Sequence, residues 1–188
     1  MIYFTADTHF CHINVIKFCN RPFQDVEQMN KTLIKNWNAR VACGDDVYIL
    51  GDFLFRGTGA DANEIIKQLN GKKYLIRGNH DRFIDRKDFD KSGFVWIKDY
   101  HIMYYEKRKF VLFHYPILEW DGYYRNSIHL YGHVHNCEGE PKRTVALGGS
   151  AINVGVDVNN YYPVSIEEIL KMVQTPNSRN ATFMSRGG

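Results

Sequence analysis

Acids, histidines and one asparagine follow apolar stretches at five places along the chain, and these residue types bind metal ions and transfer protons. They are Asp7 and His9, then Asp52, then Asn79, His80 and Asp81, then His114, and last His133 and His135. One histidine after a strand is usually just a hydrogen-bonded polar residue. Five strand ends with such groups indicate one shared site, because ligands bind at the carboxyl ends of strands in open α/β sheets.

The spacing within two of these groups places their side chains on one side of the chain. Residues two apart in extended backbone project to the same face, as Asp7 and His9 do and as His133 and His135 do. A glycine precedes the polar residues in "LGD", "RGNHD" and "YGHVH". Glycine lets the chain turn sharply and come close to a bound ion. Each pair can therefore reach into one pocket.

Strands and helices alternate in the first half of the chain, and strands dominate the second half. The expected strands span residues 2–7, 47–52, 73–81, 127–135 and 151–158. The expected helices span residues 25–42, 60–69 and 165–173. Asp25 and Ser165 are expected to cap the first and the last helix. Residues 94–116 are typical of a hairpin with the charged tip "EKRK".

This order of elements predicts an α/β domain around two packed sheets. A chain of 188 residues suits a single domain with its own core. We expect that domain to span residues 1–174. Residues 175–188 show no periodicity and are expected to form a flexible C-terminal tail.

The types and number of the candidate ligands predict a centre with two metal ions. Imidazole, carboxylate and amide donors favour Mn²⁺, with Fe, Zn²⁺ or Ni²⁺ as alternatives, and disfavour Cu(I), Ca²⁺ and Mg²⁺. Seven of the residues above are candidate metal ligands, which is too many for one ion. They are Asp7, His9, Asp52, Asn79, His114, His133 and His135. They suit two divalent ions that share a carboxylate and lie about 3.5–4 Å apart.

In chain order these groups form the patterns D-x-H, G-D, G-N-H-D, a lone His and G-H-x-H. This series resembles the calcineurin-like metallophosphoesterase superfamily over residues 2 to about 157. The stretches "DTHFCHINVIKFCNRPF" and "INVGVD" are similar to a compact bacterial and phage phosphoesterase branch. The resemblance implies a four-layer α-β-β-α sandwich, in which two mixed sheets are flanked by helices.

The resemblance also implies a role for each residue. One ion would take Asp7, His9, Asp52 and His135, and the other would take Asp52, Asn79, His114 and His133. Asp52 would thus bridge the two ions. His80 would lie beside the substrate phosphate, to stabilise charge or protonate the leaving oxygen, and Asp81 would orient His80. The residue before Arg56 is Phe55, where the family pattern has Asp or Asn.

The implied reaction is hydrolysis of a phosphomonoester or phosphodiester, with nucleotides among the candidate substrates. Two cations beside a phosphate neutralise its oxygens and lower the pKa of a bridging water, so that metal-bound hydroxide forms near neutral pH. Two alternatives remain: a DNA or RNA nuclease of the same fold, and a non-catalytic metal-binding scaffold for protein interactions. The lack of a basic stripe disfavours the nuclease, and the retention of His80 disfavours the scaffold.

Three further residues are candidates for substrate binding: His12, Arg21 and Arg56. His12 lies three residues after His9, either at the rim of the site or in an exposed loop. Arg21 either clamps a phosphate or fixes the turn before Pro22.

Several residues near the expected site allow two interpretations. Asn153 and Asp157 either orient the histidines or only end a strand. The aromatic residues of the segment after His114 either stack a nucleobase or cover the core. These residues are Tyr115, Trp120, Tyr123 and Tyr124. We expect His101 and His129, which lie within strands, to be structural.

The composition is that of an ordinary globular protein, with 44% hydrophobic residues, 24% charged residues and a formal charge of +3. The chain shows no signal sequence and no apolar run of membrane-spanning length. Its four cysteines form no C-x-x-C pair. We therefore expect a cytoplasmic monomer or homodimer that acts on a small phosphoester, with no membrane partner and with nucleic acid not favoured.

Overall fold

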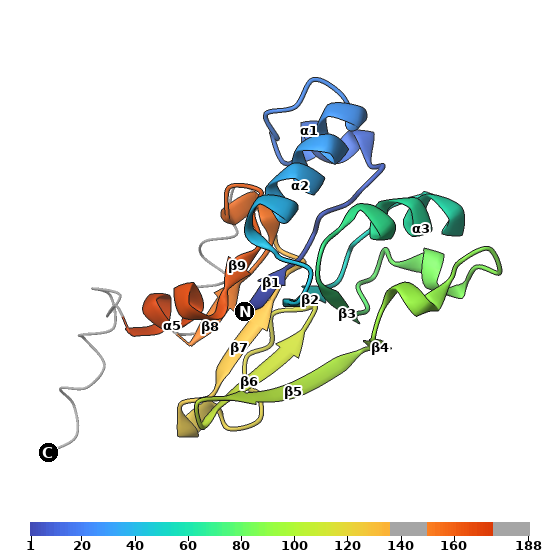
Figure 1. Cartoon of the computed structure of the whole chain (residues 1–188). Helices are drawn as coiled ribbons and strands as arrows, with labels where there is room; N and C mark the ends of the chain where they lie inside the picture. Colours follow the sequence, from blue (N-terminus) through green and yellow to red (C-terminus); the bar gives the residue numbers. More distant parts are fainter. Residues whose placement is uncertain (136–149, 175–188) are drawn as a thin grey trace, which may run out of the picture.

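Two mixed β-sheets pack face to face in the computed structural model, which describes residues 1–135 and 150–174 (Figure 1). The first sheet has the order β4-β3-β2-β1-β9. Its strands are β1 (Ile2–Thr5), β2 (Asp46–Leu50), β3 (Lys72–Ile76), β4 (Trp96–Lys98) and β9 (Val164–Ser165). Strands β1 to β4 run parallel to their neighbours, and β9 is antiparallel to β1. The carboxyl ends of β1, β2 and β3 therefore share one edge.

The second sheet has the order β5-β6-β7-β8. Its strands are β5 (Tyr100–Tyr105), β6 (Arg108–Phe113), β7 (Ile128–Tyr131) and β8 (Ala151–Asn153). Strands β5 and β6 form an antiparallel hairpin, whereas β6, β7 and β8 are parallel. The two residues at the hairpin tip, Glu106 and Lys107, both have positive φ, as a tight two-residue turn between twisted strands requires.

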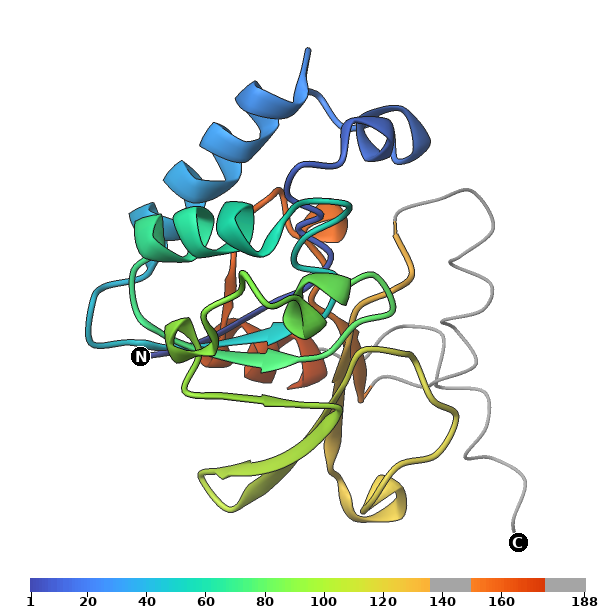
Figure 2. The ribbon, with the colours of Figure 1, turned by 90° about the vertical axis from the view of Figure 1, so that its right-hand side faces the viewer.

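Three helices cover the outer face of the first sheet: α1 (Ile13–Phe18), α2 (Val26–Arg40) and α3 (Gly59–Gln68) (Figure 2). The fourth described helix, α5 (Ile166–Gln174), lies on the opposite side of that sheet. Short 3₁₀ turns are η1 (Arg82–Asp85), η2 (Lys91–Gly93), η3 (Tyr123–Arg125) and η5 (Val156–Val158). Leu33 and Trp37 of α2 pack in one buried cluster with Ile49 and Leu75 of the sheet. Each such fully buried side chain contributes about 1.5–3 kcal/mol.

A second core lies between the two sheets. Phe4 and Leu50 of the first sheet and Phe110 and Leu130 of the second are fully buried there. The rings of Phe4 and Phe110 stack across the interface with centroids 6.4 Å apart. Helix α5 adds Ile166 and Ile169 to the same cluster. The expected sandwich of two mixed sheets flanked by helices is thus confirmed.

Both expected caps are present. The Asp25 carboxylate accepts a hydrogen bond from the Gln28 N–H at 2.8 Å and begins α2. At α5, the Glu168 N–H donates to the Ser165 hydroxyl and the Ser165 N–H donates to the Glu168 carboxylate, at 3.2 and 2.8 Å. This reciprocal pair is a capping box.

Several local expectations differ from the structure. The strands expected over residues 73–81, 127–135 and 151–158 end earlier, at Ile76, Tyr131 and Asn153. Helix α1 was not expected, because its six residues are too few to show a period. The hairpin was expected over 94–116, but β4 pairs with β3 in the first sheet and the hairpin begins at Tyr100. The chain changes sheets at Asp99, and similar aromatic and β-branched sequence on both sides hides that change.

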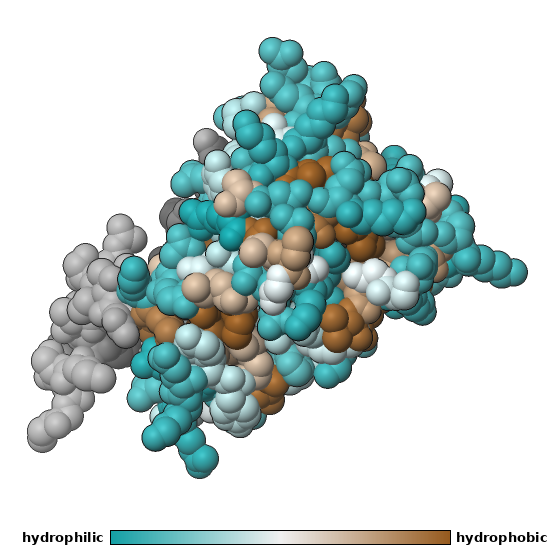
Figure 3. Space-filling view, in the orientation of Figure 1, coloured by the Kyte–Doolittle hydropathy of each residue, from teal (hydrophilic) through white to brown (hydrophobic). Residues whose placement is uncertain are grey.

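The expected limits of the domain stay a prediction, and the expected tail lies outside the described residues. Within the described residues no helix is both long and apolar enough to cross a membrane. The face drawn in Figure 3 is mostly hydrophilic, with apolar side chains in small separate areas.

Candidate metal centre

The loops that follow β1, β2 and β3 lie side by side at one edge of the first sheet. The Asp7 N–H donates to the Gly51 carbonyl at 3.0 Å, and the His9 N–H donates to the Asp52 carbonyl at 2.9 Å. The His80 N–H donates to the Asp52 carboxylate at 2.9 Å. These bonds bring the first three polar groups of the sequence together.

The second sheet adds its own polar groups to the same place. The Gly132 N–H donates to the His114 carbonyl at 3.0 Å, which joins the ends of β6 and β7. The His133 N–H donates to both carboxylate oxygens of Asp7, at 3.0 and 2.9 Å. All five predicted strand ends therefore meet at one site between the sheets.

Several residues of the site have left-handed backbone. Asp7, His9, Asp52 and His133 have φ values of 56°, 47°, 53° and 69°. Such backbone costs a non-glycine residue about 1–3 kcal/mol and is concentrated at functional sites. The turns aim these side chains at each other, where extended backbone would carry the strands past the site.

Two glycines permit the close packing of these loops. A Cβ on Gly51, which has φ +89°, would lie 2.3 Å from the His114 Nδ1. A Cβ on Gly78 would lie 2.3 Å from the Asp52 N. Both glycines thus permit a close approach between loops of the protein, whereas the expected approach of glycine to a bound ion stays a prediction.

One group of possible metal donors consists of Asp7, His9 and His135, whose donor atoms lie within 4.8 Å of one another. His9 is 2% exposed, and neither of its ring nitrogens has a hydrogen-bond partner. Buried polar atoms are rarely left without a partner. A cation at this group would bind the free electron pair of His9, so the residues present fit a metal ion.

A second group consists of Asp52, His114 and His133, again within 4.8 Å. The His114 Nδ1 lies 2.8 Å from the Leu50 carbonyl and must donate to it, so in neutral His114 the electron pair is on Nε2. That Nε2 lies 2.9 Å from the Asn79 Oδ1, and the His133 Nδ1 lies 3.0 Å from the same oxygen. These atoms lie close enough together to bind one metal ion between them.

Asp52 lies between the two groups. Its Oδ2 is 3.4 Å from the His9 Nε2 and 3.6 Å from the His114 Nε2. The side chain is only 2% exposed. One carboxylate oxygen therefore faces both donor groups, which is the place of a shared ligand.

Burial and charge act in opposite directions on these donors. Burial raises the pKa of Asp7 to about 7 and lowers the pKa of His9, which keeps that imidazole neutral and able to bind metal. Burial also works to lower the pKa of His135, but hydrogen bonds to Asp157 and Cys19 and the Asp7 charge raise it to about 10. A divalent cation would favour the ionised Asp7 and the neutral histidines.

Asp157 and Asn153 support the histidines. The His135 Nδ1 lies 2.7 Å from the Asp157 carboxylate, which directs the other ring nitrogen toward the site. The Asn153 side chain donates to the Val134 carbonyl at 2.7 Å, between the two histidines. The structure thus favours the orienting interpretation for both residues. It also places Cys19 beside His135 and Asp157, which the sequence pattern did not indicate.

Asp81 has a different role from the one that the resemblance implied. Its buried carboxylate accepts hydrogen bonds from the N–H groups of Gly78, Asp52, Phe53 and Leu54, at 2.8, 2.9, 2.7 and 3.4 Å. Burial and the nearby Asp52 raise its pKa to about 7. Asp81 therefore joins the loop after β2 to the loop after β3. It positions the backbone of Asp52, whereas the resemblance implied that it would orient the His80 ring.

The three candidates for substrate binding occupy very different positions. The structure favours the structural interpretation of Arg21: its side chain is 0% exposed, and it donates to Asp157 and to the carbonyls of Asp7 and Thr8. It is structural, because no donor is directed to solvent. Arg56 is exposed, with its guanidinium 5.3 Å from the centre of the Phe55 ring.

His12 lies at the rim of the site, half-buried. The centroid of its ring is 5.4 Å from that of the His9 ring. The His12 ring also stacks on the Phe55 ring, with centroids 3.7 Å apart. Burial and the nearby His80 lower the pKa of His12 to about 4, so its imidazole is neutral at pH 7.

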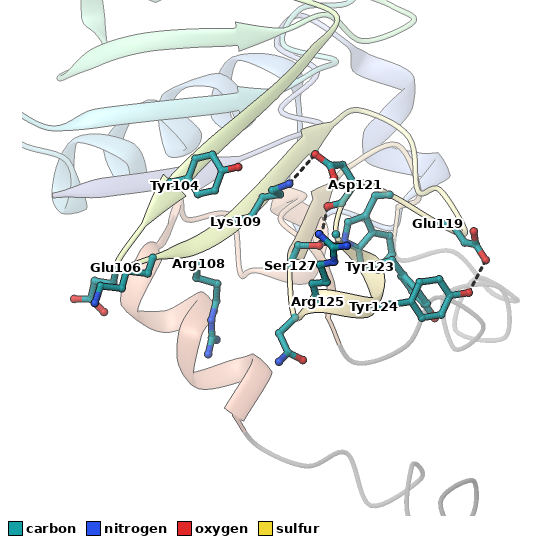
Figure 4. A pocket seen from close by; sticks show the side chains of 14 residues that line it. Tyr104, Glu106, Arg108, Lys109, Glu119, Asp121, Tyr123, Tyr124, Arg125 and Ser127 are labelled. Atoms are coloured by element: carbon teal, nitrogen blue, oxygen red, sulfur yellow. Dashed lines mark hydrogen bonds and ion pairs between the residues drawn. The ribbon is translucent and has the colours of Figure 1, made fainter.

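The aromatic residues after His114 divide between two places. The Tyr115 ring lies 4.6 Å from the His133 ring, beside the metal centre. Trp120, Tyr123 and Tyr124 instead line a pocket of about 790 Å³ between the β5–β6 tip and η3 (Figure 4). Within this pocket Lys109 forms an ion pair with Asp121, and the Tyr124 hydroxyl donates to Glu119. This pocket lies at the opposite ends of β6 and β7 from His114 and His133.

His101 and His129 are structural, as expected. His129 is fully buried, with its ring nitrogens 3.1 and 3.2 Å from the carbonyls of Val111 and Tyr115. The His101 ring lies 4.7 Å from Trp96. Neither histidine belongs to a donor group among the described residues.

Comparison with known proteins decides the family. Residues 1–140 match the family described as calcineurin-like phosphoesterase. The chain belongs to the calcineurin-like phosphoesterase family. Calcineurin-like phosphoesterases are hydrolases of phosphoric esters that depend on divalent metal ions, and the two donor groups described above agree with that class.

Relatives of this calcineurin-like phosphoesterase occur in archaea, bacteria and phages. An uncharacterized protein of Methanocaldococcus jannaschii is 40% identical over 179 residues, which are 92% of this chain and 91% of that protein. The Gene 66 protein of Mycobacterium phage L5 is 33% identical over 104 residues, which are 53% of this chain and 50% of the phage protein. The crystal structure of a protein of unknown function from Aquifex aeolicus matches with a TM-score of 0.71 and 29% identity, over 92% of this chain and 98% of that one.

Proposed function

We propose that this phosphoesterase uses two divalent metal ions that share Asp52 to hydrolyse a small phosphomonoester or phosphodiester, with nucleotides among the candidates. The observation that carries the proposal is the position of the Asp52 Oδ2, 3.4 Å from one imidazole and 3.6 Å from another. A carboxylate placed between two donor groups is the arrangement that two-metal hydrolases require.

The protein residues divide the work by position. Asp7, His9 and His135 would hold one ion, and Asn79, His114 and His133 would hold the other, with Asp52 shared. When bound, the two ions would supply hydroxide near neutral pH and would neutralise the phosphate oxygens. Asp157 keeps the His135 Nδ1 engaged, which leaves the opposite ring nitrogen for the ion.

His80 is the proposed proton donor to the leaving oxygen. Its backbone N–H binds the Asp52 carboxylate, so its Cα is tied to the shared ligand. His80 is partly exposed, and imidazole is the side chain that most often acts as a general acid or base in enzymes. Arg56 and Tyr115, at the rim of the site, are the proposed contacts for the rest of the substrate.

The metal identity, with Mn²⁺ ahead of Fe, Zn²⁺ or Ni²⁺, stays a prediction. So do the cytoplasmic location and the monomeric or homodimeric state. A small phosphoester is favoured over nucleic acid as the substrate, because the sequence contains no basic stripe that would bind the phosphate backbone.

A panel of phosphoesters tests the proposal. The protein, loaded with Mn²⁺, would be assayed on phosphomonoesters, model diesters, cyclic nucleotides and short DNA, with the metal content measured on the same sample. We expect two ions per chain, turnover on at least one small ester, and loss of turnover with excess chelator. A sample with two ions that hydrolyses none of these esters would refute the proposed reaction. Turnover on DNA alone would favour the nuclease.

A further inference from the structure

The His80 ring lacks a polar group to hold it. Its backbone N–H is bound to Asp52, but among residues 1–135 and 150–174 neither ring nitrogen has a hydrogen-bond partner. Asp81, the neighbour expected to orient this ring, uses both carboxylate oxygens on backbone N–H groups. Free ring nitrogens suit a group that must exchange protons with a substrate. A free ring nevertheless needs something to fix its rotation.

Aromatic packing replaces the missing polar partner. The Phe55 ring meets the His80 ring edge-on, with centroids 4.9 Å apart and planes at 78°. The His9 ring also contacts the His80 ring, with centroids 5.6 Å apart and planes at 56°. Edge-to-face contact is a preferred arrangement of aromatic pairs, and it depends on orientation. It therefore restricts the rotation of His80 without occupying its nitrogens.

Phe55 is itself held in place. The Phe55 N–H donates to the Phe10 carbonyl at 3.1 Å, which ties it to the loop that carries His9. The His12 ring covers one face of Phe55, with centroids 3.7 Å apart and planes at 28°. The His12 N–H in turn donates to the His9 carbonyl at 3.1 Å. The stack is thus anchored at both members to the same metal-binding loop.

We propose that Phe55 and His12 form an aromatic stack that positions the His80 imidazole against the metal centre. His12 acts in this stack as a planar ring and not as a hydrogen-bonding contact to the substrate. Phe55 and His12 are therefore positioning residues, and His80 is the group they position. The inference rests on the proposed function, because it concerns the proton donor of that reaction.

Paired substitutions separate packing from hydrogen bonding. Phe55→Leu removes the ring, and we expect it to lower kcat by about 10- to 100-fold, the loss typical of a displaced catalytic group. KM and the content of two ions should stay unchanged. Phe55→Tyr keeps the ring and should restore turnover. His12→Phe keeps a planar ring without nitrogens and should stay close to wild type, whereas His12→Ala should resemble Phe55→Leu.

A matched control uses an aromatic residue outside the stack. Phe18 is 72% exposed, and its ring centroid lies 6.4 Å from that of His12. Phe18→Leu therefore removes an aromatic ring from the same region. We expect no change in kcat. Thermal unfolding of all variants would identify any that lose activity through unfolding.

Nuclear magnetic resonance gives a readout that does not need turnover. In the Zn²⁺-loaded protein, the ring signals of His80 would be assigned by their absence in His80→Ala. We expect them to shift in Phe55→Leu and to keep their positions in Phe18→Leu. If wild type has no activity on any ester, the proposed reaction fails and the His80 signals alone decide the inference.

Three results would overturn it. The first is unchanged kcat in Phe55→Leu when wild type is active. The second is unchanged His80 signals in that variant. The third is a His12→Phe variant as impaired as His12→Ala, which would make the imidazole of His12 a direct contact to substrate.

Discussion

Arg21 and Asp157 form a buried ion pair across 136 residues of sequence, with the Arg21 Nε 2.8 Å from Oδ1 and the Nη2 2.9 Å from Oδ2 of Asp157. The same guanidinium donates to the carbonyls of Asp7 and Thr8, at 2.7 and 2.9 Å. Asp157 also contacts the His135 Nδ1. One arginine thus joins the loop after β1 to the histidine that follows β7, although it cannot touch a substrate.

Replacement of Arg21 by methionine should destabilise the protein. Removal of one partner of a buried pair leaves the other charge uncompensated, which costs about 3–5 kcal/mol. Chemical denaturation would measure the loss. Arg86→Ala is the control, because Arg86 pairs with Asp88 on the surface and such pairs contribute about 1 kcal/mol or less. Similar losses in the two variants would contradict the structural role.

Asp52→Asn should remove both metal ions together, because one carboxylate oxygen faces both donor groups. Metal analysis of the purified variant would show fewer than two ions, and turnover would be lost. Asp85→Asn, which changes a carboxylate that is 61% exposed, should keep both ions. Two ions at full occupancy in Asp52→Asn would rule out the shared ligand.

His80→Ala should keep both ions and lose turnover by about 10²- to 10⁴-fold, the usual contribution of general acid catalysis. The backbone N–H that binds Asp52 remains in alanine, so the metal content should match wild type. Steady-state kinetics and metal analysis on one preparation test this. Unchanged turnover would remove His80 from the mechanism.

Gly78→Ala should disturb the site through the backbone. The new Cβ would lie 2.3 Å from both the Asp52 N and the Asp52 Oδ1, so the loops must separate, at a cost of about 1–3 kcal/mol. Unfolding and metal titrations should both show the loss. The same substitution at Gly44, where nothing lies within 4 Å, should have little effect on either. Equal metal affinity in the two variants would argue against this close approach.

The capping box of α5 should make stability depend on pH. Burial works to raise the pKa of Glu168, but the Ser165 N–H, the Arg40 charge and the Ser165 hydroxyl outweigh it and hold that pKa below its ordinary value of 4.5. A lowered carboxyl pKa stabilises the folded state above pH 4.5, and the effect disappears as pH falls through the folded-state pKa.

Glu168→Gln tests this dependence. The variant should be less stable than wild type by about 0.5–1 kcal/mol at pH 7, the usual contribution of a partly exposed cap. The difference should shrink below pH 4.5 in thermal unfolding. Glu167→Gln removes the same charge on the same turn without touching the cap. A difference that is constant with pH would exclude the ionised Glu168 as the cause.

Much of the fold could be predicted because most helices and strands produce recognisable patterns over a few neighbouring residues. The three long helices and most strands show as periods of apolar residues, and Asp25 and Ser165 mark helix starts by side-chain chemistry. Helix α1 is too short to show a period, and β4 carries the same residue types as the strand that follows it. Which strands pair with each other depends on contacts between residues distant in sequence, so the local sequence pattern does not predict it.

The sequence by itself indicated the candidate donor residues, because ligand chemistry depends on side-chain type and on spacing within each strand end. The class of reaction followed from the resemblance of the ordered motifs to a known family, which the family match confirms. Only the tertiary structure decided what each neighbour does. In the folded protein, Arg21 is buried against Asp157, and the Asp81 carboxylate accepts hydrogen bonds from backbone N–H groups. The Phe55 ring contacts both His12 and His80. These assignments depend on contacts between loops that are distant in sequence. They arise only when the two sheets pack and bring the strand ends to one edge.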